Sequence, residues 1–490
     1  METISVRKLD HANMQIECED GIAAELREYF SFYVPGYKFM PAYKNRVWDG
    51  KIRLFNDRTR ELPAGLFNHI LTFAESREYE IIPEDSDYGT PDDSNKVNPD
   101  ALYKFIEHLK LPWEIRDYQF DAIATGIHRK RAILLSPTGS GKSLIIYALI
   151  KWYLTNYDKK VLIIVPTTSL VEQMHNDFVH YGSKEEELHR IYSGKDKVTN
   201  KRIVISTWQS VYKLTFDWFS QFGAVFGDEC HGFKSKSLMS IMNKSKEAEY
   251  RFGTTGTLDG TQTHELVLQG LFGKIYKVTT TKDLQKSETL AELDIKRIML
   301  IHDEQTRKTF GRRTYQEEIE YIIMKDSRNN FIRNLALDQK GNTLVLFQFV
   351  EKHGKVLFNK VRDKAVENRK VFFVAGETPT TDREAIRKIV EKQKDSIIIA
   401  SLGTFSTGIN IRNLNNIIFA SPSKSQIRVL QSIGRGLRQG DNKEITNLYD
   451  ISDDISWKRR QNFALLHSYE RLKIYKKERF NFKTYKVKIV

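Results

Sequence analysis

The chain is 490 residues long, too long for a single hydrophobic core, so we expect about two to four domains. Its only cysteines, Cys18 and Cys230, exclude a disulfide framework and a cysteine zinc site. The net charge of +14 favours a polyanionic partner, and nucleic acid is the first candidate. A basic soluble enzyme without such a partner is the alternative.

No segment of the sequence approaches a membrane span, and residues 1–10 lack the basic and apolar regions of a signal peptide. Together with the low cysteine content, this predicts a cytoplasmic protein that does not contact membranes.

Residues 1–95 predict a small α/β domain. Residues 21–30 have the pattern of a short amphipathic helix, and residues 51–55 and 79–82 have that of strands. The acidic, polar residues 84–100 include two prolines and predict a linker or a long surface loop.

Cations and aromatic residues are interleaved in residues 36–60 of this domain, where Pro41 and Gly50 favour a hairpin. Cations pair with phosphates and rings stack on exposed bases, so this stretch is a candidate nucleic-acid surface. The alternative is that the aromatic residues form the core of the domain and the charges its solvated rim. The cations expected to contact nucleic acid are Lys44, Arg46, Lys51 and Arg53.

From Pro112 onwards, apolar strands alternate with helical stretches, which predicts a largely parallel sheet covered by helices. A second unit of this kind begins near Asn342. The charged residues 285–335 between the two units have no readable role. The expected strands are residues 133–135, 161–165, 203–206, 224–226 and 251–256 in the first unit, and 343–347, 370–374, 396–400 and 416–420 in the second.

Residues 133–143 predict a strand, a turn with two glycines and the start of a helix, which together make an anion cradle. Lys142 supplies a positive charge for the β- and γ-phosphates, and Ser143 supplies a hydroxyl ligand for Mg²⁺. Ser136 stands where the general pattern has glycine. The residues expected to hold the nucleotide are Pro137, Thr138, Gly139, Ser140, Gly141, Lys142 and Ser143.

A second apolar strand ends in two adjacent carboxylates, Asp228 and Glu229. One carboxylate can hold Mg²⁺ through its water shell, and its neighbour can take a proton from an attacking water. We assign the metal role to Asp228 and the role of the base to Glu229. Because the pair follows the phosphate loop within one α/β unit, the two stretches together predict an ATP site with Mg²⁺.

After about Asp454 the chain becomes strongly basic, with eleven Lys or Arg and two Glu in residues 455–490. We expect a helix over residues 456–477, followed by an extended end. This tail is a second candidate nucleic-acid surface. The alternative is a helix that closes the second unit and carries a solvated basic face.

Further short motifs occupy fixed positions in the two units. They are residues 116–119 (RDYQ), 165–169 (VPTTS), 206–209 (STWQ), 255–257 (TGT), 401–410 (SLGTFSTGIN) and 431–438 (QSIGRGLR). In this order they resemble the motifs of superfamily 2 helicases and translocases of the DExH type. The resemblance covers residues 112–452. It is closer to phage DNA helicases of recombination and repair, and there it extends to residues 49–54 and 314–319.

This resemblance implies two tandem RecA-like, doubly wound parallel-sheet domains, with a small N-terminal α/β domain and a basic C-terminal helical extension. We expect the domains to span residues 1–95, 96–283, 284–452 and 453–490. ATP and Mg²⁺ are the implied cofactors.

The implied substrate is branched or forked DNA, with RNA–DNA hybrids as a further partner. The family migrates junctions, regresses stalled forks and unwinds displacement loops and R-loops during recombination, repair and replication restart. The resemblance also implies a monomer, located in the host cytoplasm if the protein comes from a phage.

Single residues acquire roles from the same resemblance. Gln119 would read the adenine edge, because an amide both donates and accepts, and Arg116 would help to hold the base. In the second unit, Gln431 would be catalytic beside Arg435 and Arg438, which would act as arginine fingers.

Hydroxyls and backbone amides at strand ends suit phosphate oxygens without reading sequence. The residues expected to contact nucleic acid in the motor are Thr167, Thr168, Thr207, Trp208 and Ser401, and Gly408 is expected at the nucleotide.

Three other functions stay open. A DExH RNA helicase has the same motor residues. The motor part of a restriction enzyme shares these motifs, although no nuclease constellation stands out in the sequence. A non-catalytic nucleic-acid-binding or annealing protein with a degenerate motor is disfavoured by Lys142, Asp228, Glu229, Arg435 and Arg438, which are all present.

Overall fold

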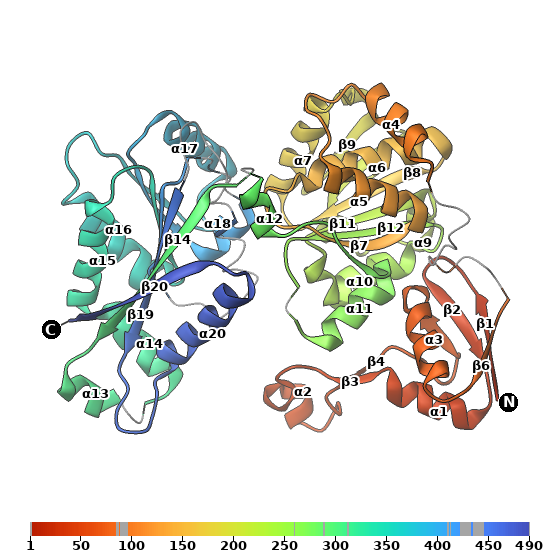
Figure 1. Ribbon diagram of the computed structural model, residues 1–490, viewed down its shortest axis with the longest axis horizontal. Coiled ribbons are helices and arrows are strands. Elements are labelled where there is room, and N and C mark those ends of the chain that lie inside the picture. The colour runs from red at the N-terminus through yellow and green to blue at the C-terminus, as the bar shows by residue number, and fades with distance from the viewer. Residues whose placement is uncertain are drawn as a thin grey trace. The chain divides into compact units, whose positions relative to one another are not determined.

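The structure, a computed structural model, describes residues 2–84, 88, 97–258, 260–287, 290–310, 313–408, 411, 413–421, 433–434 and 445–489 (Figure 1). Its two compact units are Met1–Ser136 with Gly141–Thr279, and Thr280–Val490 with the loop tip Pro137–Ser140. No helix among these residues has the length and apolar character needed to cross a membrane. The predicted catalytic residues Gln431, Arg435 and Arg438 lie outside the described part of the chain.

The N-terminal α/β domain contains a four-stranded sheet in the order β5-β2-β1-β6. The helix and the strand expected at residues 21–30 and 79–82 are confirmed as α1 and β6. The elements are β1 (Thr3–Lys8), β2 (Asn13–Glu17), α1 (Asp20–Tyr29), β5 (Glu61–Pro63), α3 (Phe67–Glu75) and β6 (Glu80–Pro83).

A separate hairpin arises from this domain between α1 and β5. Its strands, β3 (Ser31–Tyr33) and β4 (Lys51–Arg53), pair antiparallel, and a short helix, α2 (Pro41–Lys44), lies between them. Of the aromatic residues interleaved with the cations, Phe55 is buried in the domain core, whereas the side chain of Phe39 is 81% exposed. The alternative that these aromatic residues form the core therefore holds for Phe55 but not for the hairpin.

The first RecA-like sheet has seven parallel strands in the order β13-β7-β12-β11-β8-β10-β9. Side chains of β8 alternate between two cores: Val161 and Ile163 pack on one face, and Leu162 and Ile164 on the other. Burial on both faces explains why such strands are continuously apolar. The strands are β7 (Arg131–Leu135), β8 (Lys160–Val165), β9 (Leu188–Ile191), β10 (Ile203–Thr207), β11 (Phe222–Asp228), β12 (Tyr250–Thr255) and β13 (Ile275–Lys277).

Helices cover this sheet, as Figure 1 shows. Those used below are α5, which begins at the RDYQ motif, α6 after the phosphate loop, α7 after β8, and α11 after β12. The helices of the unit are α4 (Pro99–His108), α5 (Asp117–Arg129), α6 (Lys142–Asn156), α7 (Thr168–His180), α8 (Trp208–Val211), α9 (Phe216–Ser220), α10 (Lys236–Lys244) and α11 (Gln262–Phe272).

The N-terminal domain packs directly on α11 of this motor domain. Leu266 of α11 is part of the N-terminal hydrophobic core, and His69 Nε2 lies 3.0 Å from Gln269 Oε1. A second contact, an ion pair of 3.3 Å, joins Asp10 to Lys246 in the loop before β12. The small domain is therefore held by two elements of the motor domain rather than by the chain alone.

The second RecA-like sheet also has seven parallel strands, in the order β16-β17-β15-β18-β19-β14-β20. All four strands expected in this unit are confirmed. The described part of the charged residues 285–335 contains a further strand, β14, the helices α13 and α14, and most of α15. The strands are β14 (Glu292–Ile301), β15 (Thr343–Phe347), β16 (Val371–Val374), β17 (Ile397–Ser401), β18 (Asn416–Phe419), β19 (Ile445–Asp454) and β20 (Asn481–Lys488).

The basic tail contributes a helix and then β20, which pairs with β14 as an edge strand of this sheet. The helix begins at Phe463, later than the Ser456 expected. The helices of the unit are α12 (Thr281–Lys286), α13 (Glu304–Phe310), α14 (Tyr315–Met324), α15 (Asp326–Asp338), α16 (Lys355–Arg362), α17 (Thr380–Lys392), α18 (Leu402–Gly408) and α20 (Phe463–Lys477).

Gly65 marks the closest approach of the N-terminal domain to α11, because a Cβ there would lie 2.0 Å from the carbonyl oxygen of Gln269. We expect Gly65→Ala to lower the free energy of unfolding by about 1–3 kcal/mol, as overpacking does. Denaturant unfolding measures the difference. Gly21→Ala is the control, because a Cβ there has nothing within 4 Å. Equal stability of the two variants would contradict tight docking.

Candidate functional site

Three predicted motifs meet at one edge of the first sheet because the strands that carry them are neighbours. In register, Thr255 of β12 pairs with Leu135 of β7, and Thr254 pairs with Asp228 of β11. The phosphate loop, the TGT motif and the two carboxylates all follow the carboxyl ends of these strands. Parallel sheets bind ligands at this edge.

The phosphate loop takes positive φ angles at Gly139 (88°) and Gly141 (80°) but not at Ser136. Ser136 is fully buried, and its N–H donates to the carbonyl of Thr255 at 2.9 Å. The loop therefore has glycine where its backbone requires it, and a side chain is tolerated where the general pattern has glycine. Gly141 directly precedes α6, so the loop leads into a helix N-terminus that attracts anions.

The predicted charged residues of this site lie together. Lys142 Nζ donates to the carbonyl of Ser136 at 3.3 Å, and Thr254 Oγ1 donates to Asp228 Oδ1 at 2.8 Å. Burial raises the pKa of Asp228, the negative charge of Glu229 raises it further, and the positive charge of Lys142 opposes both. A cation that ligates Asp228 would relieve this repulsion.

Glu229 adopts a left-handed backbone conformation, with φ of 51°, which is uncommon for a residue other than glycine. His231 Nδ1 lies 3.3 Å from Glu229 Oε2 and 3.0 Å from Thr255 Oγ1. Since Thr255 Oγ1 donates to the carbonyl of Thr257, it accepts from His231. His231 therefore joins the carboxylate motif to the TGT motif.

Gln119 is 4% exposed and joins the start of α5 to the phosphate loop. Its Oε1 accepts from the N–H of Arg116 at 3.0 Å, and a Cβ on Gly141 would lie 2.3 Å from its Nε2. The side chain of Arg116 is exposed and donates to Tyr118 Oη. Contact of Gln119 and Arg116 with adenine stays a prediction.

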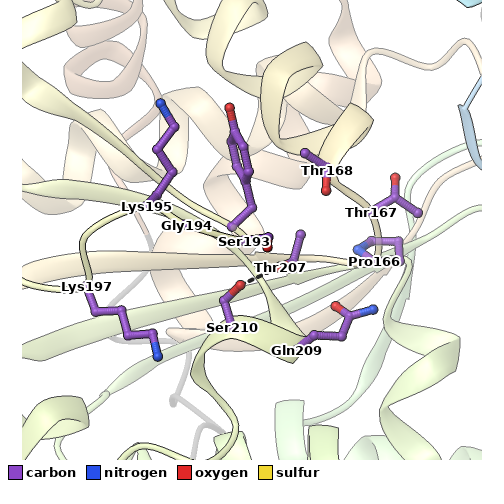
Figure 2. A pocket seen from close by; sticks show the side chains of 11 residues that line it. Pro166, Thr167, Thr168, Ser193, Gly194, Lys195, Lys197, Thr207, Gln209 and Ser210 are labelled. Atoms are coloured by element: carbon purple, nitrogen blue, oxygen red, sulfur yellow. Dashed lines mark hydrogen bonds between the residues drawn. The ribbon is translucent and has the colours of Figure 1, made fainter. Parts of the chain in front are cut away.

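A cavity of about 590 Å³ lies at the ends of β8, β9 and β10 (Figure 2). It contains the predicted Thr167, Thr168 and Thr207, whereas Trp208 is half-buried against a core and does not line it. Its walls carry hydroxyl groups and two lysines, which suit phosphate oxygens. The lining residues are Pro166, Thr167, Thr168, Tyr192, Ser193, Gly194, Lys195, Lys197, Thr207, Gln209 and Ser210.

Lys195 and Lys197 were missed by the sequence analysis because β9, which precedes them, was not predicted. The available signal was Gly194 among polar residues, and Gly194 has a φ of 81°. The two lysines supply the positive charge of the cavity, since its other lining residues are neutral.

The remaining predicted residues lie elsewhere. Ser401 of the second unit is 8% exposed and donates to Thr404 Oγ1 at 2.7 Å, and Gly408 ends α18. On the N-terminal hairpin, Lys44 and Arg46 are exposed, Lys51 lies over the ring of Tyr33, and Arg53 pairs with Asp49.

Tyr181 is a further residue that the sequence analysis missed. Its hydroxyl lies 2.9 Å from Ser143 Oγ, the predicted metal ligand. Burial, with a smaller contribution from Asp177, raises the pKa of Tyr181 to about 12, so this hydroxyl is neutral at physiological pH. When the oxygen of Ser143 faces a metal, its O–H can donate to Tyr181, which would fix the serine rotamer. Tyr181 directly follows α7, the helix that begins at Thr168 in the cavity.

Comparison with known proteins places these sites in a family context. Residues 3–84 match the family "DNA helicase UvsW, N-terminal", residues 101–260 match "Type III restriction enzyme, res subunit", and residues 327–440 match "Helicase conserved C-terminal domain". The ATP-dependent DNA helicase uvsW of Enterobacteria phage T4 is 37% identical, with 98% of each chain covered.

Two further similarities extend this result. The crystal structure of T4 UvsW matches with a TM-score of 0.52 and 32% identity, covering 99% of each chain. The DNA 3'-5' translocase XPB2 of Sulfurisphaera tokodaii is 23% identical over 69% of this chain and 81% of its own length.

We expect Tyr181→Phe to weaken nucleotide binding about 2- to 10-fold when Mg²⁺ is present, the effect of losing one hydrogen bond. Binding without Mg²⁺ should be unchanged. Titration of a fluorescent ATP analogue with and without EDTA measures both. Tyr147→Phe is the control, because it removes a buried hydroxyl next to Tyr181 that does not contact Ser143. Equal effects of the two changes, or a loss that is independent of Mg²⁺, would contradict the role of Tyr181.

Proposed function

The chain belongs to the UvsW family of DNA helicases within superfamily 2, and from this premise we propose that it hydrolyses ATP to move along DNA and remodel branched DNA. Its reactions would be junction migration, fork regression and the unwinding of displacement loops and R-loops, in recombination, repair and replication restart. The protein would act as a monomer in the cytoplasm, on DNA and on RNA–DNA hybrids.

The observation that carries this proposal is the meeting of Lys142, Asp228 and Glu229 at neighbouring strand ends, beside a helix N-terminus. Ser143 and Asp228 offer the oxygen ligands that Mg²⁺ prefers. These two residues would hold Mg²⁺, which would supply positive charge to neutralise the phosphates. The helix N-terminus and Lys142 would hold the phosphates, and Glu229 would take the proton of the attacking water. Arg435 and Arg438, with Gln431, would complete the site.

Two surfaces support the choice of a branched substrate. The cavity with Lys195 and Lys197 would hold one strand through its phosphates, together with Ser401 of the second unit. Recognition of a branch requires a second contact outside this path. The N-terminal hairpin offers one, because it combines the exposed cations Lys44 and Arg46 with the exposed ring of Phe39.

ATP hydrolysis measured with forked DNA, duplex DNA, single-stranded DNA and RNA tests this function. We expect DNA to stimulate hydrolysis and RNA not to do so, and we expect Lys142→Ala to be inactive with every nucleic acid. Stimulation by RNA alone would favour the DExH RNA helicase. Binding without hydrolysis would favour an annealing protein.

We expect Glu229→Gln to retain the binding of Mg²⁺ and ATP but to lower turnover by about 10²- to 10⁴-fold, because the amide keeps the size of the side chain and loses its basicity. Single-turnover hydrolysis and nucleotide titration separate the two effects. Turnover that falls by less than about tenfold would assign the base to another residue.

We expect replacement of Lys44, Arg46, Lys51 and Arg53 by Glu to weaken binding to a DNA junction. The slope of log affinity against log salt should flatten by about 0.9 for each duplex phosphate that the variant no longer binds. Lys44 and Arg46 should contribute more than Arg53, which is already paired with Asp49.

The control for this experiment replaces Lys104 and Lys184 by Glu, because both are exposed lysines of the motor domain outside the predicted surfaces. Junction affinity and salt slope that stay unchanged in the hairpin variant would show that its charges are a solvated rim.

A further inference from the structure

A short hairpin in the second unit, residues 456–461, forms a surface that the motifs do not explain. Trp457 and Arg460 exchange two backbone hydrogen bonds of 3.1 Å, which close a tight turn at Lys458 and Arg459. Lys458 has a φ of 54°. The turn therefore presents three consecutive cations, Lys458, Arg459 and Arg460, all of them exposed.

The base of this hairpin is rigid. Asn462 Oδ1 accepts from the N–H of Ile455 at 3.0 Å, and its Nδ2 donates to Glu318 Oε1 at 2.9 Å. The carboxylate of Glu318 also accepts the N–H groups of Phe463 and Ala464 at the start of α20. Both chain ends of the hairpin are thus fixed to buried groups, so its cations are held in place rather than on a loose loop.

Neighbouring residues add to the positive charge. Arg307 Nε donates to the carbonyl of Ser456 at 2.8 Å, and Lys308 Nζ lies 5.2 Å from the ring centre of Trp457. Arg460 Nη2 reaches the carbonyl of Arg313. The carboxylates next to these residues are already engaged, since Glu304 pairs with Lys308 and Glu317 with Arg313.

Lys458, Arg459 and Arg460 lack this compensation: within the described part of the chain, no carboxylate lies within ion-pair distance of them. Three adjacent cations repel one another, and although Arg460 donates to the carbonyl of Arg313, no negatively charged group among the described residues offsets this repulsion. A polyanion would do so, because phosphates bring several negative charges at short spacing.

The hairpin lies at the carboxyl ends of the strands of the second sheet, on the side where Ser401, the predicted nucleic-acid contact of this unit, also lies. It follows the carboxyl end of β19, whose Asp454 pairs in register with Ile301 of β14. Ser401 ends β17, three strands away in the same parallel sheet. In register, Ala400 of β17 is level with Asp450 of β19, so the hairpin begins five residues beyond the position level with Ser401. At the usual strand geometry, it lies about 14 Å from Ser401 across the sheet and about 17 Å beyond it along the strands.

We propose that the hairpin at residues 456–461 is a second nucleic-acid site, which binds the phosphodiester backbone of duplex DNA. It reads no sequence, because its cations contact phosphates rather than base edges. The inference rests on the proposed function only in taking DNA as the ligand.

The test is the salt dependence of DNA binding without ATP, on duplex, forked and single-stranded DNA, for the triple change Lys458→Ala, Arg459→Ala, Arg460→Ala. We expect weaker binding to duplex and forked DNA, with a salt slope lower by about 2–3, or about 0.9 for each phosphate that is no longer bound. Single-stranded DNA should be affected less. Arg459→Lys with Arg460→Lys should keep the slope, since it keeps the charge.

The matched control changes Lys364, Lys392 and Lys394 to Ala. These three lysines are exposed: Lys364 follows α16, Lys392 ends α17 and Lys394 follows α17. They lie at the opposite edge of the same sheet. Thermal unfolding of each variant checks that the fold is kept. If the triple variant of Lys458, Arg459 and Arg460 and the control have equal salt slopes on duplex and forked DNA, the proposal is wrong. If the unchanged protein binds no DNA, the proposed function fails instead.

Discussion

In-register parallel pairing of β7, β12 and β11 is the constraint on which the nucleotide site depends. It brings the end of β7, Thr255 and Asp228 to one edge, and the chain can place a loop after each strand. The N–H of Ser136 then bonds to the carbonyl of Thr255, and His231 bonds to its hydroxyl. The strand register therefore brings together short motifs that lie far apart in the sequence, and no long side chain is needed to connect them.

Strand β12 also connects the nucleotide site to the N-terminal domain. Arg251 of β12 is fully buried without a carboxylate partner among the described residues, and burial lowers its pKa to about 9. Its guanidinium donates to the carbonyls of Met242, Ser245 and Leu271, at the ends of α10 and α11. Because the C-terminal ends of helices carry partial negative charge, these carbonyls replace a counter-ion. Because the N-terminal domain packs on α11, β12 also holds in place the helix that supports this domain.

Sequence patterns predicted the strands that are apolar throughout, such as β8 and β15, and they predicted the local motifs. They did not predict β14 and β19, because buried charges interrupt their apolar pattern: Asp450 of β19 pairs with Arg471, which lies 21 residues further along the chain. Tyr181 was missed because its hydrogen-bond partner, Ser143, precedes it by 38 residues. Contacts of this range are set by the tertiary fold, which short sequence windows do not contain.

The basic tail shows why net charge alone does not locate a binding surface. Arg471 forms a buried ion pair with Asp450, and Lys473 pairs with Glu470. Exposed lysines on β20 line an outer strand of the sheet, where charge prevents pairing with another chain. These cations have structural explanations that need no ligand. The cations of the 456–461 hairpin have no ion-pair partner among the described residues, and hydrogen bonds of Asn462 and Glu318 fix both ends of the turn that carries them.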